Sequence, residues 1–260
     1  MNIVIFSKDR GCQLELFLRS MKTHFKEWEN QNINILYTYT NNKFAMGYDI
    51  TKKLHPEFNY KLEKNFKSDL LTLINKNEKL STFFVDDIIF KEDFSIEDDK
   101  VKLVENDANV LCLSLRLHPN LTYCYPARVK MAKPPTDSNN RFDWRGKPGD
   151  YGYPMSLDGH IFRTNDIYEL FHTLNYNNPN TLESNMASRP ISRPFMVMYD
   201  KSVIINNPAN RVQTFNQNVY GNISAEYINE QYLSGKKISI KTSEGFNNIS
   251  CHQEIDIIFD

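Results

Sequence analysis

Two adjacent carboxylates interrupt the most apolar stretch of the sequence. Residues 83–90 read FFVDDIIF, so Asp86 and Asp87 lie between three apolar residues on each side. Adjacent residues of an extended chain face opposite ways, so one Asp can ligate a divalent cation while the other binds a sugar hydroxyl or a second side chain. A turn with two solvated acids explains the same pair equally well from these residues alone.

The segments before the two acids predict strands and helices in alternation. Ile3–Phe6 and Thr82–Val85 are apolar runs typical of buried parallel strands, and the second run ends at Asp86. Two helices and one more strand are expected between them: a helix from Gln13, a strand at 33–37 and a helix at 66–80. Ligands of an open α/β sheet bind at the carboxyl ends of its strands, which is where this pattern puts the acids.

The second half of the chain alternates less regularly. Residues 118–157 hold most of the prolines and glycines, with aromatic and basic residues between them, and such a long irregular stretch is more often a binding loop than filler. The other expected elements are strands at 88–94, 110–117, 203–205 and 254–260, and helices at 167–174, 181–187 and 224–233. We therefore predict one α/β domain over 1–260, with a mostly parallel sheet flanked by helices.

Composition excludes several classes of protein. Lys and Arg total 31 against 32 Asp and Glu, a net charge of −1, so nothing in the overall charge predicts a nucleic-acid partner. Four scattered cysteines predict free thiols, and we expect a cytoplasmic protein without a transmembrane segment.

The order of these motifs resembles the GT-A-fold glycosyltransferases. The resemblance rests on the strand, the loop SKDR, the helix, and then a strand ending in VDD, and it covers the first 90 residues best. Three later motifs are similar in order to that family's glycine loop, acidic helix start and closing polar strand: SLDGHIFR at 156–163, NPNTLES at 178–184 and IINNPANRVQ at 204–213. The family's third acid is absent, because position 88 is Ile.

The resemblance implies a Rossmann-like sheet, with residues 1–117 binding a nucleotide sugar and residues 118–260 binding the acceptor. It implies Mn²⁺ or Mg²⁺ on the donor diphosphate, with the metal ligands Asp87, Asp86 and His160. The donor-binding residues expected are Ser7, Lys8, Asp9, Arg10, Asp86, Arg145 and Gly159. Acceptor stacking is expected from Trp144, Tyr151 and Tyr153.

Two acids are expected to take the proton of the acceptor hydroxyl, Glu183 and Asp158. For Glu183 a structural role is equally open, because Asn180 and Glu183 have the spacing of a helix capping box. The acceptor would be a glycan, a lipid-linked saccharide or a protein, as in polysaccharide biosynthesis, with peripheral membrane association for a lipid-linked one. Two alternatives stay open: a non-catalytic carbohydrate- or nucleotide-binding relative, and a nucleotidyltransferase, which the low count of 9 glycines disfavours.

Overall fold

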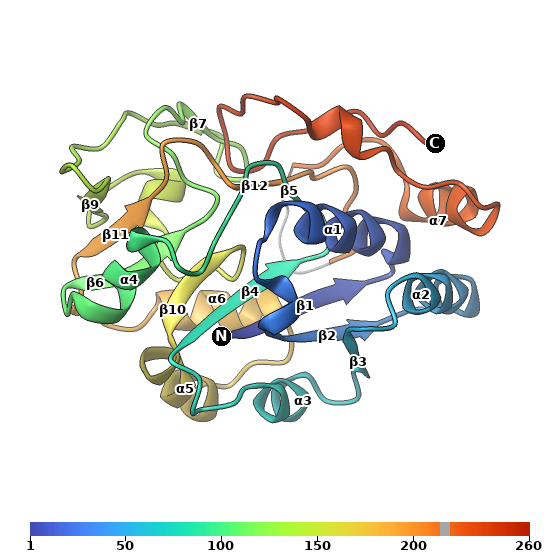
Figure 1. The fold of residues 1–260 in the computed structure, drawn as a ribbon, viewed down its shortest axis with the longest axis horizontal. Coiled ribbons are helices and arrows are strands. Elements are labelled where there is room, and N and C mark those ends of the chain that lie inside the picture. Colours follow the sequence, from blue (N-terminus) through green and yellow to red (C-terminus); the bar gives the residue numbers. More distant parts are fainter. Residues whose placement is uncertain (214–218) are drawn as a thin grey trace.

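The fold centres on one twisted, eight-stranded sheet (Figure 1). The computed structural model describes residues 1–213 and 219–260. The strand order is β3-β2-β1-β4-β10-β6-β11-β9. The bounds are β1 Asn2–Lys8, β2 Asn32–Thr38, β3 Asn59–Leu62, β4 Leu80–Val85, β6 Val110–Ser114, β9 Arg141–Asp143, β10 His160–Arg163 and β11 Phe195–Met198. Two small sheets accompany it, formed by β5 Ile88–Phe90 with β12 Ile204–Asn206 and by β7 Tyr123–Cys124 with β8 Val129–Lys130.

The predicted α/β class and the mostly parallel sheet are confirmed. β1 runs parallel to β2 and β4, β2 to β3, and β6 to β11. β10 is antiparallel to both of its neighbours, β4 and β6, and it joins the first half of the sheet to the second. The residues of β10 were expected in a glycine loop before a helix, so this central strand was missed.

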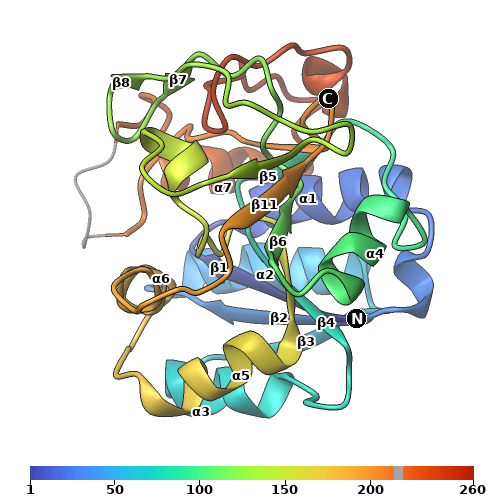
Figure 2. The same ribbon diagram turned by 90° about the vertical axis from the view of Figure 1, so that its left-hand side faces the viewer.

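Helices cover both faces of the sheet (Figures 1 and 2). Their bounds are α1 Gly11–His24, α2 Asn42–Leu54, α3 Phe66–Leu73, α4 Asp99–Asn106, α5 Thr164–Thr173, α6 Pro179–Ala187 and α7 Ala225–Leu233. α3, α5 and α6 pack on one face through a core that includes Phe83, and α1 and α4 pack on the other through a core that includes Phe84. Alternating side chains of β4 therefore reach both cores, as expected of a strand buried on both faces.

Several element boundaries differ from the expectation. The helix at 66–80 ends at Leu73, and the strand at 88–94 is only the three residues of β5, which leave the main sheet to pair with β12. The tail 254–260 was expected to be a strand, but it forms one isolated bridge, between Ile238 and Phe259. The helices α2 and α4 were not predicted. In α4 only two residues are buried, so its apolar stripe is short.

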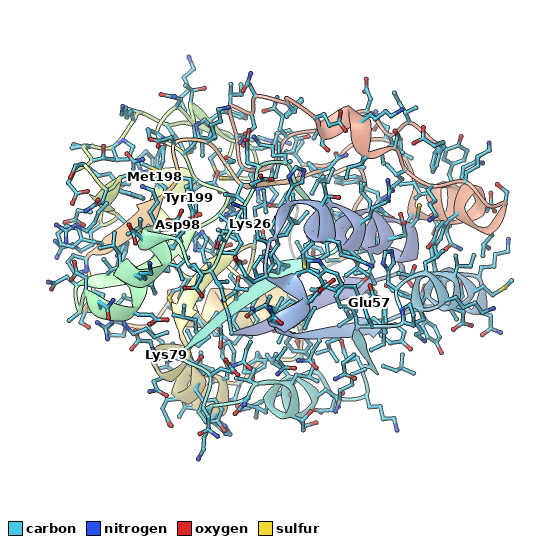
Figure 3. All side chains as sticks on the ribbon, viewed as in Figure 1. Lys26, Glu57, Lys79, Asp98, Met198 and Tyr199 are labelled. Carbon is cyan, nitrogen blue, oxygen red and sulfur yellow. The ribbon has the colours of Figure 1, made fainter. Side chains whose placement is uncertain are left out.

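Side chains fill the space between the sheet and the helices (Figure 3). Lys79 and Glu57, both labelled there, pair at the surface with Glu105 and Lys22. The four cysteines are buried and free, as predicted. No helix in the described part of the chain is long and apolar enough to cross a membrane.

A buried acid on α1 ties the C-terminal segment to that helix. The Glu15 side chain is 1% exposed, and its carboxylate lies 3.0 Å from Arg19 Nη2 and 3.3 Å from Lys237 Nζ. Burial opposes its ionisation, but His55 and Arg19 outweigh burial and lower the pKa of Glu15 to about 2. This carboxylate therefore stabilises the fold above its unfolded pKa of 4.5, and the contribution is lost as the pH falls towards 2.

We expect Glu15→Gln to lower the free energy of unfolding by roughly 3 kcal/mol at pH 7, because Arg19 and Lys237 lose a buried partner. Urea denaturation at pH 7 and pH 3 measures this, and the deficit should shrink at pH 3. Glu29→Gln on the exposed surface is the control, with an expected change within about 0.5 kcal/mol. Equal stability of Glu15→Gln and Glu29→Gln would contradict the stabilising role of the buried Glu15 carboxylate.

Candidate functional site

A cavity of about 550 Å³ opens at the carboxyl ends of β1, β2 and β4. Its wall includes Ser7, Lys8, Arg10, Asp86, Asp87 and Asp158. This is the edge at which an α/β sheet binds its ligands, and all six are residues that sequence analysis singled out. The structure thus brings together acids and bases that lie far apart in the sequence.

The two adjacent acids converge on one arginine. Arg10 Nη1 donates to Asp86 Oδ1 and to Asp87 Oδ2, at 2.9 Å each. Asp86 is almost fully buried and also accepts hydrogen bonds from Ser7 Oγ at 2.8 Å and from the Lys8 backbone N–H at 3.0 Å. The expectation that the acids face opposite ways is wrong, because they lie in a turn after β4 rather than on extended backbone.

Arg10 is held in place from a second side. Its Nε donates to Asn210 Oδ1 at 2.8 Å, and its Nη2 donates to the Asn210 carbonyl at 2.5 Å. Tyr48, on α2, is fully buried; its hydroxyl lies 2.7 Å from Ser7 Oγ and accepts a hydrogen bond from the Arg10 N–H. The guanidinium is therefore a fixed positive charge at the cavity wall, with most of its donors engaged.

A second group of charges surrounds Asp158. Arg116 Nη1 and His252 Nε2 each lie 3.4 Å from Asp158 Oδ2, and Arg116 Nη2 lies 3.6 Å from Asp150. Burial opposes ionisation of Asp158, but the contact with His252 and the charge of Arg116 outweigh it and lower the pKa of Asp158. Burial likewise opposes the charged form of His252, yet Asp158 raises the pKa of His252 above its usual value.

Glu183 lies behind Asp158 and is not a helix cap. The cap of α6 is Asn178, whose side chain accepts from the Thr181 N–H, so the expected pairing of Asn180 with Glu183 is wrong. Glu183 Oε1 instead accepts a hydrogen bond from the Leu157 N–H at 2.9 Å. Loss of hydration, reinforced by the charge of Asp158, raises the pKa of Glu183 to about 7.

Only one of the expected metal ligands is placed to hold a cation in the cavity. Asp86 and Asp87 both line it, and each of their oxygens accepts a hydrogen bond, but the Asp87 side chain is 15% exposed against 5% for Asp86. His160 is buried on β10, where its Nδ1 lies 3.0 Å from the Pro154 carbonyl, and burial lowers the pKa of His160 to about 3. Among the described residues no group of three or more His, Cys, Asp or Glu could hold a metal. Asp87 with oxygens of a bound diphosphate fits a hard divalent cation.

Three of the expected donor-binding residues lie outside this cavity wall. Asp9 accepts a hydrogen bond from the Thr40 N–H at 2.7 Å and lines an adjoining hollow of about 460 Å³. Arg145 is exposed and pairs with Asp143. Gly159 has φ +72°, and a Cβ there would meet Ile204 Cδ1 at 2.1 Å, so this glycine permits the close packing of β10 on β12.

The aromatic residues expected to stack on an acceptor also serve the scaffold. Tyr151 is fully buried, and its hydroxyl donates to the His118 carbonyl at 2.7 Å. Trp144 is half-buried, and its Nε1 donates to the Arg193 carbonyl at 2.9 Å. Tyr153 is half-buried beside Glu183. The aromatic side chains that do line the cavity are Tyr39, Phe66, Tyr125 and Tyr220, together with Phe6.

Arg116 and His252 were missed as site residues. Arg116 carried a signal, because it continues a run of alternating Leu at 111–117 and is a charged residue in a predicted buried strand. His252 carried none, because only the folded chain brings the C-terminal segment back to Asn206, with which it forms a β-bridge.

Comparison with known proteins identifies one relative by sequence. No protein-family model matches the chain. Over 217 residues it is 30% identical to the bifunctional glycosyltransferase pgtA of Dictyostelium discoideum, a match that covers 73% of this chain and 28% of that protein. The predicted resemblance to glycosyltransferases is confirmed by this match, and the chain spans just over a quarter of the relative's length.

Among the solved structures that are similar to this chain, two share 13% and 14% of their sequence with it. One is residues 1–349 of TarS from S. aureus, with a TM-score of 0.43 and 13% identity over 78% of this chain and 60% of that one. The other is a cytidylyltransferase from Leptospira borgpetersenii, with a TM-score of 0.44 and 14% identity over 90% of this chain and 92% of that one.

Proposed function

We propose that this chain transfers a sugar from a nucleoside-diphosphate donor to an acceptor hydroxyl. The observation that carries the proposal is the cavity at the carboxyl ends of β1, β2 and β4, which joins basic residues, a carboxylate pair and the ionised Asp158. Similarity to a bifunctional glycosyltransferase over 73% of the chain supports the same reaction class.

The donor diphosphate binds beside Lys8 and Arg10. Negative charge grows on the leaving diphosphate as its bond to the anomeric carbon breaks, and fixed positive charge stabilises that state. Arg10 suits this task because Asp86, Asp87 and Asn210 hold it rigidly, so little reorganisation is needed during the reaction. Lys8 is half-buried on the same wall and adds a second cation.

Asp87 is the residue that would hold Mn²⁺ or Mg²⁺, together with oxygens of the diphosphate. When bound, such a cation neutralises charge on the leaving group. Asp86 takes no direct part in this binding. Its two oxygens instead fix Ser7, the Lys8 backbone and Arg10 around the donor site.

Asp158 is the base. Its carboxylate accepts the proton of the acceptor hydroxyl while the acceptor oxygen bonds to the anomeric carbon and the bond to the diphosphate breaks. Arg116 and His252 keep Asp158 ionised, whereas Glu183, with its pKa raised to about 7, retains a proton in acidic solution. Two acids whose environments separate their pKa values can take different roles, and here Asp158 is the one that lines the cavity.

The acceptor is a hydroxyl of a glycan, a lipid-linked saccharide or a glycoprotein. It approaches from the side of the cavity formed by Asp158, His252 and Tyr125, all of which come from the second half of the chain. The ring of Tyr125 offers an apolar face on which a sugar can stack.

Thermal unfolding tests the donor site. UDP, GDP, CDP and their sugar conjugates are titrated with and without Mn²⁺ into the wild type and Asp87→Ala. We expect one nucleotide series to raise the melting temperature, by an amount equivalent to about 2.7 kcal/mol when the ligand is at 100 times its Kd. The part of the shift that requires Mn²⁺ should vanish in Asp87→Ala.

Two results would contradict the proposal. Absence of any shift with all these nucleotides would favour a non-catalytic relative. Release of pyrophosphate from a nucleoside triphosphate, without release of sugar from any nucleotide sugar, would identify a nucleotidyltransferase instead.

A further inference from the structure

Two asparagines, Asn206 at the end of β12 and Asn210 shortly after it, each have one amide atom bound and one without a partner among the described residues. Asn206 is 1% exposed and Asn210 is 7% exposed, and both contribute to the cavity wall. Asn206 Oδ1 and Asn210 Nδ2 are buried and have no hydrogen-bond partner in the part of the chain that the structure describes, 1–213 and 219–260. A buried polar atom without a partner is costly, so native proteins keep few of them, and each calls for an explanation.

The bound half of each amide fixes its orientation. Asn206 Nδ2 donates to Asp87 Oδ1 at 3.2 Å, which leaves the oxygen as the unpaired atom. Asn210 Oδ1 accepts from Arg10 Nε at 2.8 Å, which leaves the nitrogen unpaired. Because Asp87 can only accept and Arg10 can only donate, neither amide can be flipped without losing its contact.

The backbone of Asn206 is equally fixed. Its N–H donates to the Cys251 carbonyl at 3.0 Å, and its carbonyl accepts from the Gln253 N–H at 3.0 Å. These bonds anchor the residue between β12 and the segment that carries His252. One hydrogen-bond acceptor and one donor are therefore held rigidly in the same cavity wall as Asp87 and Arg10.

We propose that Asn206 and Asn210 bind hydroxyl groups of the transferred sugar and determine which sugar the protein accepts. This inference rests on the proposed function and goes beyond it in naming the sugar-recognition residues. A sugar hydroxyl both donates and accepts, so it matches an unpaired carbonyl oxygen and an unpaired amide N–H. Such groups discriminate strongly, because a sugar lacking the matching hydroxyl leaves them unsatisfied.

Asn207 provides a matched contrast within the same motif. Its Nδ2 donates to the Ile255 carbonyl at 2.9 Å, and its Oδ1 accepts from the Ile255 N–H at 3.1 Å. Both amide atoms of Asn207 are thus used in holding the C-terminal segment. Three asparagines within five positions therefore divide into one with a structural role and two with an unpaired atom at the cavity.

Calorimetric titration of Asn206→Ala, Asn210→Ala and Asn207→Ala tests the inference. The probes are UDP with UDP-glucose and UDP-galactose, which differ in one hydroxyl configuration, and GDP with GDP-mannose. Asn206→Ala and Asn210→Ala each also remove a contact of the donor site, from Asn206 to Asp87 and from Asn210 to Arg10, so binding of the nucleoside diphosphate should weaken as well. We expect affinity for the best nucleotide sugar to fall 10- to 100-fold further than affinity for the nucleoside diphosphate. Asn207→Ala should bind both probes as the wild type does.

The outcomes separate the two proposals. An equal loss for nucleoside diphosphate and nucleotide sugar, or no loss for either, would overturn sugar recognition and leave the donor site standing. Failure of the wild type to bind any of the five probes would overturn the proposed function itself. If an Ala variant does not fold, Asn206→Ser and Asn210→Ser make the same comparison with a smaller cavity.

Discussion

Asp158→Asn is expected to slow sugar transfer by roughly 10²- to 10⁴-fold, the usual contribution of a general base. The amide keeps the size of the side chain but cannot accept the proton of the acceptor hydroxyl. Donor binding should change little, because Asp87, Arg10 and Lys8 are untouched. Release of nucleoside diphosphate over time, measured at several donor concentrations, gives kcat and KM separately, and the loss should fall on kcat.

The pH profile gives this prediction a second readout. Arg116, His252, His160 and Glu183 are titratable or charged groups that act on Asp158, and the pKa of Asp158 is lowered by His252 and Arg116 against the effect of burial. Because a base works only when ionised, the wild-type rate should persist to low pH and fall as the pH drops through this lowered pKa. In His252→Gln one source of that lowering is gone, so the acid limb should move to higher pH.

Asp158 and His252 also make the free energy of unfolding depend on pH, each in its own pH range. The lowered pKa of Asp158 contributes stability above its ordinary 3.8, which is lost as the pH falls below that value. The raised pKa of His252 contributes stability that is complete below its ordinary 6.5, and this is lost as the pH rises through the folded value. Disruption of the contact between Asp158 and His252 should therefore lower the free energy of unfolding most between pH 3.8 and pH 6.5.

Asp150→Asn is the control for Asp158→Asn. Asp150 also lies beside Arg116, at 3.6 Å, but it is not part of the cavity wall. This variant should lose stability while keeping kcat within about tenfold of the wild type. If Asp158→Asn transferred sugar as fast as Asp150→Asn, Asp158 would not be the base, and Glu183→Gln would become the next variant to measure.

The strands β1 and β4 were predictable because their signals are local. Ile3–Phe6 and Thr82–Val85 are continuous apolar runs, and such runs identify strands buried on both faces without knowledge of their neighbours. The four residues of β10 give no such signal. They become a strand only because β4 and β6 offer hydrogen-bonding edges on both sides.

The site was predictable only in part, because some of its contacts join residues that lie far apart in the sequence. Asp86, Asp87, Lys8 and Arg10 follow predicted strands, so the sheet edge brings them together. The partners that fix their charge, such as Asn210 for Arg10, lie far away in the sequence. Residue types alone also could not distinguish Asn206, with an unpaired atom at the cavity, from Asn207, whose amide is used entirely in structure.

Arg10→Met should have the largest effect on stability. The variant keeps much of the side-chain volume but leaves Asp86 and Asp87 adjacent, mostly buried and without their shared cation. Removal of one partner from a buried ion pair costs about 3 to 5 kcal/mol, which for a chain of this size lowers the melting temperature by roughly 10 °C. Urea and thermal unfolding measure the loss, and nucleotide-induced stabilisation should disappear as well.

Loss of a cation at this cavity wall can weaken nucleotide binding, lower the stability of the fold, or both. Lys8→Met separates these two effects. Lys8 lines the same cavity, but its side chain is half-buried and does not lie between the two carboxylates. This variant should bind nucleoside diphosphates more weakly while unfolding at nearly the wild-type temperature. If Arg10→Met were also as stable as the wild type, the carboxylate pair would not depend on Arg10, and its negative charge would be free for a divalent cation. Loss of stability in Arg10→Met alone would instead show that Arg10 first holds the turn after β4 in place, so that Asp87 faces the cavity before any donor binds.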